Sequence, residues 1–201
     1  MKIVFFEIED GEQAYLEEKL KGHELQFFPD LLTKDTVDKA KDAEIISTFR
    51  NSPVTKDLTD RLLNLRMITT RSTGYDNILP EVRADKRLVV CNVPHYGTHT
   101  VAEHAFALLL GLSRKIYLSV ERTRHGEFNH NHLTGFDLYD KTIGIIGLGD
   151  IGESVMRIAK GFGMHVVVFS HHPDEKIAKK LGITFLNFNE LLAVSDVVTL
   201  H

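Results

Sequence analysis

The sequence predicts an α/β fold in which parallel sheets are covered by helices on both faces. Between Lys2 and Cys91, short apolar runs alternate with helix-like segments, and the connections are short. This alternation is typical of a parallel sheet. The segment 141–170 then reads as strand, glycine turn, amphipathic helix and second strand, which is the pattern of another parallel unit.

The composition narrows the possible partners. The 201 residues are 43% hydrophobic and 26% charged, as expected for a folded globular protein, and the net charge of −4 does not indicate nucleic-acid binding. The single cysteine, Cys91, lies in an apolar run, where we expect a buried strand residue; it excludes an internal disulfide. With no signal-peptide pattern and no apolar run long enough for a bilayer, we expect a cytoplasmic protein without a membrane partner.

The first half contains five expected strands, and ligands of such sheets bind at the carboxyl ends of the strands. Two of these ends are polar, 49–52 and 70–76. The second could form an anion-binding nest of amide N–H groups, or a simple polar turn closed by Gly74 with a solvated Arg71. Arg50, in the first, is either a carboxylate clamp or a surface charge. The strands are expected at 2–8, 23–28, 43–49, 66–70 and 87–92, and helices at 11–21, 33–42, 55–64 and after Pro80.

A linker at 92–98 precedes a long expected helix. Thr100 and Glu103 have the spacing of a capping box, and the helix is expected to run to about Arg122. It is apolar nearly all round over 106–112, which predicts burial in a core or against a second subunit. The polar stretch 123–140 contains His125, His130 and His132, but the lack of further ligands at suitable spacing argues against a zinc site. Further elements are expected at 174–181, 184–186, 189–193 and 196–201.

The segment 147–152 has the sequence Gly-Leu-Gly-Asp-Ile-Gly, a GxGxxG motif between a strand and a helix. In this context Gly147 permits a tight turn, Gly149 permits close approach of a pyrophosphate, and Gly152 permits close packing of helix and strand. The helix N-terminus favours phosphate binding. We therefore predict a dinucleotide site.

Several stretches together resemble the D-specific 2-hydroxyacid dehydrogenases, most closely the D-lactate dehydrogenases. They are RSTGYDNI (71–78), NVPHYGTHTVAEHAFALLLGLSR (92–114), GFDLYDKTIGIIGLGDIG (135–152) and SDVVTLH (195–201). The resemblance implies a flavodoxin-like substrate domain at 1–98, without its C-terminal return segment, and the first half of a Rossmann NAD(P)-binding domain at 99–201. It also implies a small 2-hydroxy or 2-keto acid substrate and a homodimer through the helix after Thr100.

The resemblance also implies roles for individual residues. The backbone at Ser72, Thr73 and Gly74 would hold the substrate carboxylate, which reverses the simpler interpretation of that loop. Tyr96 would also lie at the substrate. Arg50 is a further expected substrate-binding residue because of its place at the end of a strand, not because of the resemblance. The expected cofactor-binding residues are Thr100, Gly147, Gly149, Asp150, Ile151, Gly152, Ser170 and His171.

Two departures from the family pattern matter. The family's catalytic arginine, glutamate and histidine motifs do not occur in this sequence, and His201 matches a strand end. Since the reaction needs a base and a cation at the substrate, we expect the 201-residue chain alone to be inactive, whereas its parent protein would transfer hydride between NAD(P) and the acid. Ser170 stands where NAD-specific sites usually have a carboxylate, so the cofactor is NAD or NADP.

Two alternatives to an enzyme remain open at this stage. Relatives of corepressor type sense dinucleotides as dimers without catalysis. A plain regulatory dinucleotide domain of the kind that gates ion transport is a third possibility, although the separate α/β domain at 1–92 argues against it.

Overall fold

The computed structural model describes residues 1–201, which divide into two compact units, Met1–Tyr96 and Gly97–His201. The division lies close to the boundary expected after residue 98. Each unit has its own parallel sheet and its own hydrophobic core. No helix in the chain is both long and apolar enough to cross a membrane.

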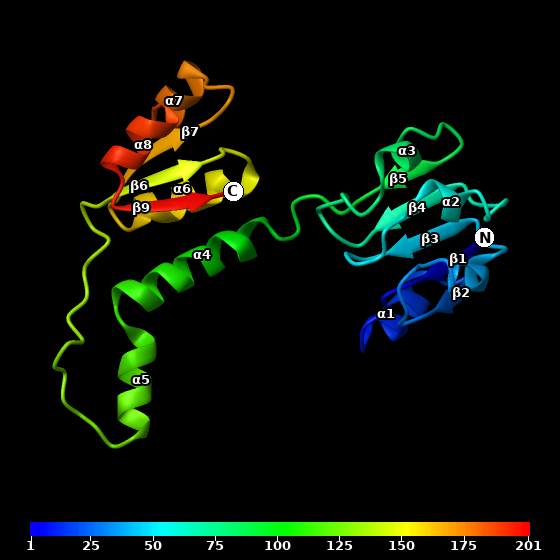
Figure 1. Ribbon diagram of the computed structural model, residues 1–201, viewed down its shortest axis with the longest axis horizontal. Coiled ribbons are helices and arrows are strands. Elements are labelled where there is room, and N and C mark those ends of the chain that lie inside the picture. Colours follow the sequence, from blue (N-terminus) through cyan, green and yellow to red (C-terminus); the bar gives the residue numbers. More distant parts are fainter. The chain divides into compact units, whose positions relative to one another are not determined.

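Unit 1 contains a five-stranded parallel sheet with the strand order β2-β1-β3-β4-β5 (Figure 1). This order is that of flavodoxin-like folds, as predicted. Lys2 of β1 pairs with Glu24 of β2 at one side of the sheet, and Thr69 of β4 pairs with Cys91 of β5 at the other side. The strands are β1 (Lys2–Phe5), β2 (Glu24–Phe27), β3 (Ile45–Thr48), β4 (Met67–Thr70) and β5 (Val89–Cys91).

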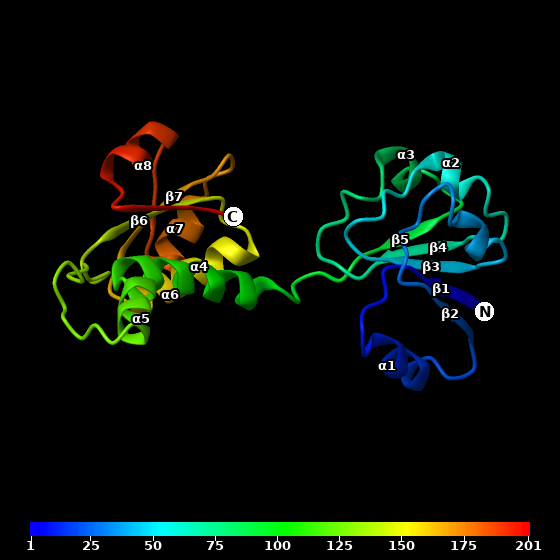
Figure 2. The ribbon, with the colours of Figure 1, turned by 60° about the horizontal axis from the view of Figure 1, so that its bottom comes forward.

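Helices cover both faces of this sheet. Helix α1 (Glu12–Lys19) lies on one face, and α2 (Lys56–Thr59) and α3 (Pro80–Arg83) lie on the other (Figure 2). The main core of unit 1 includes apolar side chains from α2 and α3, among them the fully buried Val82 and Leu58, which is 3% exposed. Helix α1 buries none of its residues.

Two expected helices of unit 1 are much shorter than predicted. The segment 33–42 forms only a 3-10 turn, η1 (Val37–Ala40), and 55–64 forms only the single turn of α2. Leu63, which lies in the segment expected to be helical, is 89% exposed. Such short segments are placed by tertiary packing of a few side chains rather than by helical periodicity. Cys91 lies in β5 as expected but is only partly buried.

Unit 2 contains a four-stranded parallel sheet with the order β8-β7-β6-β9. The chain steps from β6 through β7 to β8 and then returns to the other side of β6, which is the order of the first half of a Rossmann domain. Ile146 at the end of β6 pairs with Phe169 in β7 and with Leu200 in β9. The strands are β6 (Thr142–Ile146), β7 (His165–Phe169), β8 (Thr184–Phe185) and β9 (Val197–Leu200).

The helices of unit 2 lie on both faces of its sheet. Helices α4 (Thr98–Ser113) and α6 (Asp150–Gly161) pack together on one face, and α8 (Phe188–Val194) covers the other (Figure 2). Asn187 and Glu190 form a capping box at the start of α8 that the sequence analysis missed. Asp174 caps α7 (Glu175–Leu181) through its side chain.

The predicted start and end of the long helix are both wrong. Helix α4 begins at Thr98, its N-cap is Gly97, and no side chain caps it, so Thr100 and Glu103 do not form a capping box. Lys115 adopts a left-handed conformation with φ 52°, and this ends α4 before α5 (Ile116–Arg124) begins. A left-handed residue cannot continue a right-handed helix.

The expected burial of 106–112 is confirmed for only part of the helix. Phe106 is 4% exposed and stacks on Phe162 with their ring centroids 5.4 Å apart. Leu108 and Leu112, however, are 58% and 76% exposed. One side of α4 therefore packs on α6, while the other presents large apolar side chains to solvent.

Candidate functional site

The glycine turn follows β6 at the carboxyl edge of the unit 2 sheet. Gly147 has φ 95°, a left-handed conformation that glycine adopts without steric cost. A Cβ atom at this position would lie 2.1 Å from the carbonyl oxygen of His201, at the end of β9. The turn thus sits where the strand order reverses between β6 and β9, the point at which doubly wound sheets bind their ligands.

The other two glycines of the motif differ in what surrounds them. A Cβ atom at Gly152 would lie 2.2 Å from the Gly147 carbonyl oxygen, so helix α6 can approach the turn only because residue 152 lacks a side chain. At Gly149 no atom of the chain lies within 4 Å of the corresponding position. The space over Gly149 is open, which is what close approach of a pyrophosphate requires.

Helix α6 begins directly after this turn. Gly149 is its N-cap and provides no side-chain cap, and Asp150 and Ile151 are its first two residues. The partial positive charge of a helix N-terminus favours anions. The buried side of α6, formed by Val155, Met156 and Ala159, fixes the helix on the core of unit 2.

Ser170 and His171 follow β7 at the same edge of the sheet. The Gly147 amide donates to the Phe169 carbonyl at 2.9 Å, so the turn and the end of β7 are adjacent. The Ser170 hydroxyl accepts a hydrogen bond from the His172 amide at 3.2 Å, and the exposed His171 ring contacts Phe169 edge-on. The structure therefore places Gly147, Ser170 and His171 at one edge of the unit 2 sheet.

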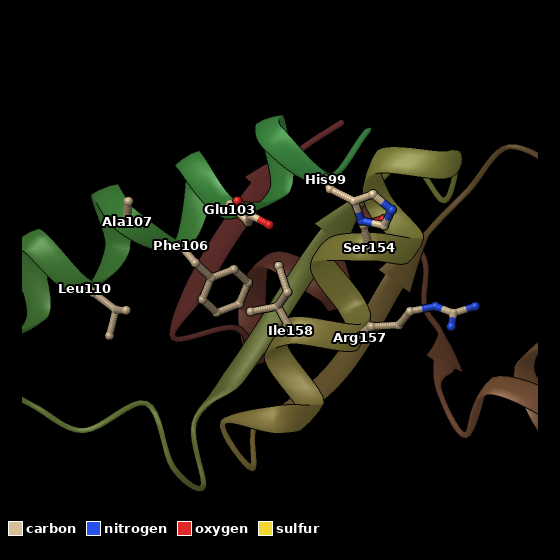
Figure 3. A pocket seen from close by; sticks show the side chains of 8 residues that line it. All are labelled: His99, Glu103, Phe106, Ala107, Leu110, Ser154, Arg157 and Ile158. Carbon is tan, nitrogen blue, oxygen red and sulfur yellow. The ribbon is translucent and has the colours of Figure 1, made fainter. Parts of the chain in front are cut away.

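Thr100 lies in the first turn of α4 and is exposed. A pocket of about 440 Å³ lies in the groove between α4 and α6 (Figure 3). His99 faces Ser154 at one end of it, and Leu110 lies at the other. The first turns of α4 and α6 are thus at the same end of unit 2, and Thr100 lies at the end that carries the glycine turn. No predicted site residue lines the pocket itself.

In unit 1 the loop Ser72–Gly74 follows β4. Ser72 is 4% exposed, and its hydroxyl contacts the Thr70 hydroxyl at 2.6 Å and donates to the Gly74 carbonyl at 2.7 Å. The Thr73 hydroxyl donates to the Val93 carbonyl at 3.0 Å. These bonds use side chains and carbonyl groups, and none of the three consecutive amide N–H groups of the loop donates to an acceptor in the chain. The loop can therefore offer these N–H groups to an anion.

Arg71 is not the solvated charge of the simpler interpretation. Its side chain is 16% exposed, and its guanidinium donates to the Phe6 and Glu7 carbonyls, the latter at 2.7 Å. It also pairs with Glu12 at 3.3 Å. Arg71 therefore joins the carboxyl ends of β1 and β4 and supports the loop that follows it.

Arg50 and Tyr96 are both exposed. The Arg50 guanidinium lies 4.5 Å from the centroid of the Phe49 ring, which orients this side chain through a cation–π contact. Tyr96 is 59% exposed and ends unit 1.

Glu7 is a residue of this edge that the sequence analysis missed. It is 7% exposed, has φ 57°, and accepts hydrogen bonds from the amides of Phe49, Asn51 and Ser52 and from the Ser52 hydroxyl. Burial raises the pKa of the Glu7 carboxyl, but these hydrogen bonds outweigh burial and hold that pKa below its usual 4.5. A buried acidic residue is rare unless it is paired, but from the sequence Glu7 lay within the expected strand 2–8, where nothing marked it as a hydrogen-bonded side chain.

No group of three or more histidine, cysteine, aspartate or glutamate side chains is arranged to hold a metal ion. His125 instead contacts the Glu121 carbonyl of its own helix at 2.9 Å. Burial lowers the pKa of the His201 imidazole below its usual 6.5. That ring contacts the Thr199 hydroxyl at 2.8 Å, at the end of β9.

Similarity to known proteins covers the whole chain. Residues 106–201 match the family described as D-isomer specific 2-hydroxyacid dehydrogenase, NAD binding domain. The whole chain is 35% identical to a 2-hydroxyacid dehydrogenase homolog of Zymomonas mobilis and 34% identical to the D-lactate dehydrogenase of Escherichia coli. It spans 62% of the length of each.

Solved structures give the same picture. The D-lactate dehydrogenase of Aquifex aeolicus, complexed with NAD and lactic acid, superposes with a TM-score of 0.90 at 30% identity, over 99% of this chain and 60% of that one. The apo structure of the Escherichia coli enzyme superposes with a TM-score of 0.84 over all of this chain and 65% of that one. Both comparisons extend over unit 1 as well as unit 2.

Proposed function

Because the chain belongs to the D-isomer specific 2-hydroxyacid dehydrogenase family, we propose that it forms the substrate-binding and dinucleotide-binding part of an NAD(P)-dependent D-2-hydroxyacid dehydrogenase. The parent protein would reduce a small 2-keto acid such as pyruvate to the D-2-hydroxy acid, and catalyse the reverse reaction. NAD(P) supplies the hydride chemistry. The residues of this chain bind and orient the two reactants.

The observation that carries the proposal is the pair of glycines at the start of α6. Backbone atoms of the chain occupy the space next to Gly152, whereas the space next to Gly149 is open. Both glycines follow β6, where the strand order of the sheet reverses. A pyrophosphate needs this arrangement, in which α6 packs closely against the turn at Gly152 and leaves open space at Gly149. The amide groups of Asp150 and Ile151 would bond the phosphate oxygens, and Thr100 would lie towards the nicotinamide.

The substrate side of the proposal rests on the Ser72–Gly74 loop. Its unused amide N–H groups would hold the substrate carboxylate, and Arg50 and Tyr96 would lie close to the acid. The Arg71 contacts with β1 keep this loop in place. Pre-positioned donors lose little entropy on binding, which suits recognition of a small anion.

Titration of the chain with NADH tests the cofactor site, using calorimetry or nicotinamide fluorescence. Gly149→Ala places a methyl group in the open space and should weaken NADH binding about tenfold or more without unfolding unit 2. Gly161→Ala, at the far end of α6 with open space around it, is the matched control and should leave NADH binding unchanged. Equal affinities for NADH in the wild type and Gly149→Ala would reject the site.

Turnover should require catalytic side chains that residues 1–201 do not contain. The sequence 1–201 contains no family motif for the catalytic arginine, glutamate or histidine. We therefore expect the 201-residue chain to bind NADH without oxidising it in the presence of pyruvate. Pyruvate-dependent loss of NADH absorbance by the purified chain would contradict this assignment of the catalytic groups.

The proposal includes tolerance of NADP. Ser170 directly follows β7, at the position where a carboxylate would repel a 2′-phosphate, and it precedes the exposed His171 and His172. Hydroxyl and imidazole groups can donate hydrogen bonds to a phosphate. Dissociation constants for NADH and NADPH within about tenfold of each other are expected; a preference of about a hundredfold for NADH would contradict tolerance.

We also propose that the parent protein is a homodimer through α4 and α5. Leu108 and Leu112 of α4, and Tyr117 of α5, are between 58% and 76% exposed. Clusters of large exposed apolar side chains of this kind mark interaction surfaces. Association of a second copy would remove them from water.

A further inference from the structure

Glu7 directs all of its carboxylate hydrogen bonds to one segment, 49–52. Oε2 accepts from the amides of Phe49 at 3.0 Å and Ser52 at 3.1 Å and from the Ser52 hydroxyl at 2.6 Å. Oε1 accepts from the Asn51 amide at 2.8 Å. The Ser52 hydroxyl in turn accepts from the Leu32 amide at 2.9 Å.

The segment 49–52 is joined to the turn that follows β4. The Phe49 carbonyl accepts hydrogen bonds from the Thr70 hydroxyl at 3.0 Å and from the Asn77 side-chain amide at 2.9 Å. The Thr70 hydroxyl also contacts the Ser72 hydroxyl at 2.6 Å. Hydrogen bonds therefore link Glu7 to Phe49 and Phe49 to Thr70, and the contact between the Thr70 and Ser72 hydroxyls extends this path to the loop with the unused amide groups.

We propose that Glu7 is a positioning residue that fixes the segment 49–52, with Arg50, against the Ser72–Gly74 loop and thereby sets the affinity for the 2-keto acid. This rests on the proposed function of that loop. Glu7 does not touch the substrate. It acts through the three backbone amides that it binds.

The placement of Glu7 favours this role over simple stabilisation of the fold. The four hydrogen bonds to Glu7 also stabilise unit 1, so what distinguishes a positioning role is the segment that they hold. Glu7 lies two residues beyond β1, at the carboxyl edge of the sheet where ligands of this fold bind. Its four hydrogen bonds hold the backbone of residues 49–52, the segment that follows β3, in one path.

The test compares Glu7→Gln with two controls in the 201-residue chain. Glu9→Gln removes an exposed carboxylate two residues away. Val82→Ala removes fully buried volume from the unit 1 core outside 49–52, and so shows what a loss of stability alone does to binding. Affinities for oxamate, an unreactive analogue of pyruvate, and for NADH are measured by calorimetry below the melting temperature of every variant.

Glu7→Gln should weaken oxamate binding about fivefold or more, because the amide side chain presents NH₂ to backbone N–H donors and displaces the segment. NADH binding should not change, and both controls should bind oxamate as the wild type does. If Glu7→Gln does not fold, Glu7→Asp, which keeps the charge but has a shorter reach, should show the same loss more weakly.

Wild-type affinity for oxamate in Glu7→Gln, or an equal loss in Val82→Ala, would overturn the positioning role. A wild-type chain that binds NADH but not oxamate would overturn it together with the substrate loop. Failure of the wild type to bind NADH would count against the proposed cofactor site alone. The role of Glu7 is judged from a different quantity, the affinity of the wild type and of Glu7→Gln for oxamate.

Discussion

The Ser52 hydroxyl donates a hydrogen bond of 2.6 Å to the Glu7 carboxylate, although 45 positions separate the two residues in the sequence. Both side chains are buried, at 0% and 7% exposure. Because the bonds to Glu7 stabilise its charged form, the carboxylate couples the stability of unit 1 to pH.

The pKa of Glu7 is lower in the folded chain than its usual 4.5. Its contribution to stability is therefore fully present above that value and is lost as the pH falls through the lowered pKa. Unfolding of the wild type by urea, followed by the NMR signals of unit 1 from neutral pH to about pH 3, should show this loss.

In the same experiment Glu7→Gln should cost on the order of 2 kcal/mol at neutral pH, since buried donors lose a charged acceptor. The variant should also show a weaker acid dependence than the wild type. Glu9→Gln serves as the exposed control. Identical slopes of stability against pH in Glu7→Gln and the wild type would show that another group is responsible.

Gly152→Ala should destabilise unit 2. The added Cβ atom would lie 2.2 Å from the Gly147 carbonyl oxygen, so α6 or the turn must shift. Overpacking against backbone suggests a loss of about 3 kcal/mol, measured by urea unfolding of unit 2. Gly149→Ala, where space is open, should cost far less stability while weakening NADH binding. A Gly152→Ala variant as stable as the wild type would contradict the close packing.

Ser170→Asp should convert the proposed tolerant site to NADH preference. A carboxylate at the end of β7 would accept from a ribose hydroxyl but repel a 2′-phosphate. The dissociation constant for NADPH should rise about tenfold or more, with that for NADH unchanged or lower. Ser170→Ala, which adds no charge, is the control; unchanged NADPH binding in Ser170→Asp would place the 2′ position elsewhere.

Leu112→Asp should weaken the proposed dimer. The side chain is 76% exposed in the isolated chain, so the charge costs little there but much in a buried interface. Sedimentation of the parent protein should show more monomer for this variant. Leu63→Asp, on unit 1 at 89% exposure, should leave the distribution unchanged. A similar monomer fraction for the two variants would exclude α4 from the interface.

Much of the fold could be predicted because it depends on local pattern. The β-branched runs predict the strands, and their alternation with helical segments predicts parallel sheets, whereas the strand orders of the two sheets were implied by the family resemblance. The glycine turn could be located because each glycine answers a local backbone need, as φ 95° at Gly147 shows. Ends of helices were less predictable: Lys115 turns left-handed at a position without glycine or proline.

The sequence by itself therefore determined the α/β fold class and the glycine turn, because periodicity and glycine spacing are properties of neighbouring residues. Only the tertiary structure decided that Arg71 is bonded to the end of β1 and that Glu7 binds 49–52. These contacts join residues more than 40 positions apart. Such pairings arise when parallel strands bring their carboxyl ends to one edge, and no local pattern records which side chains then meet.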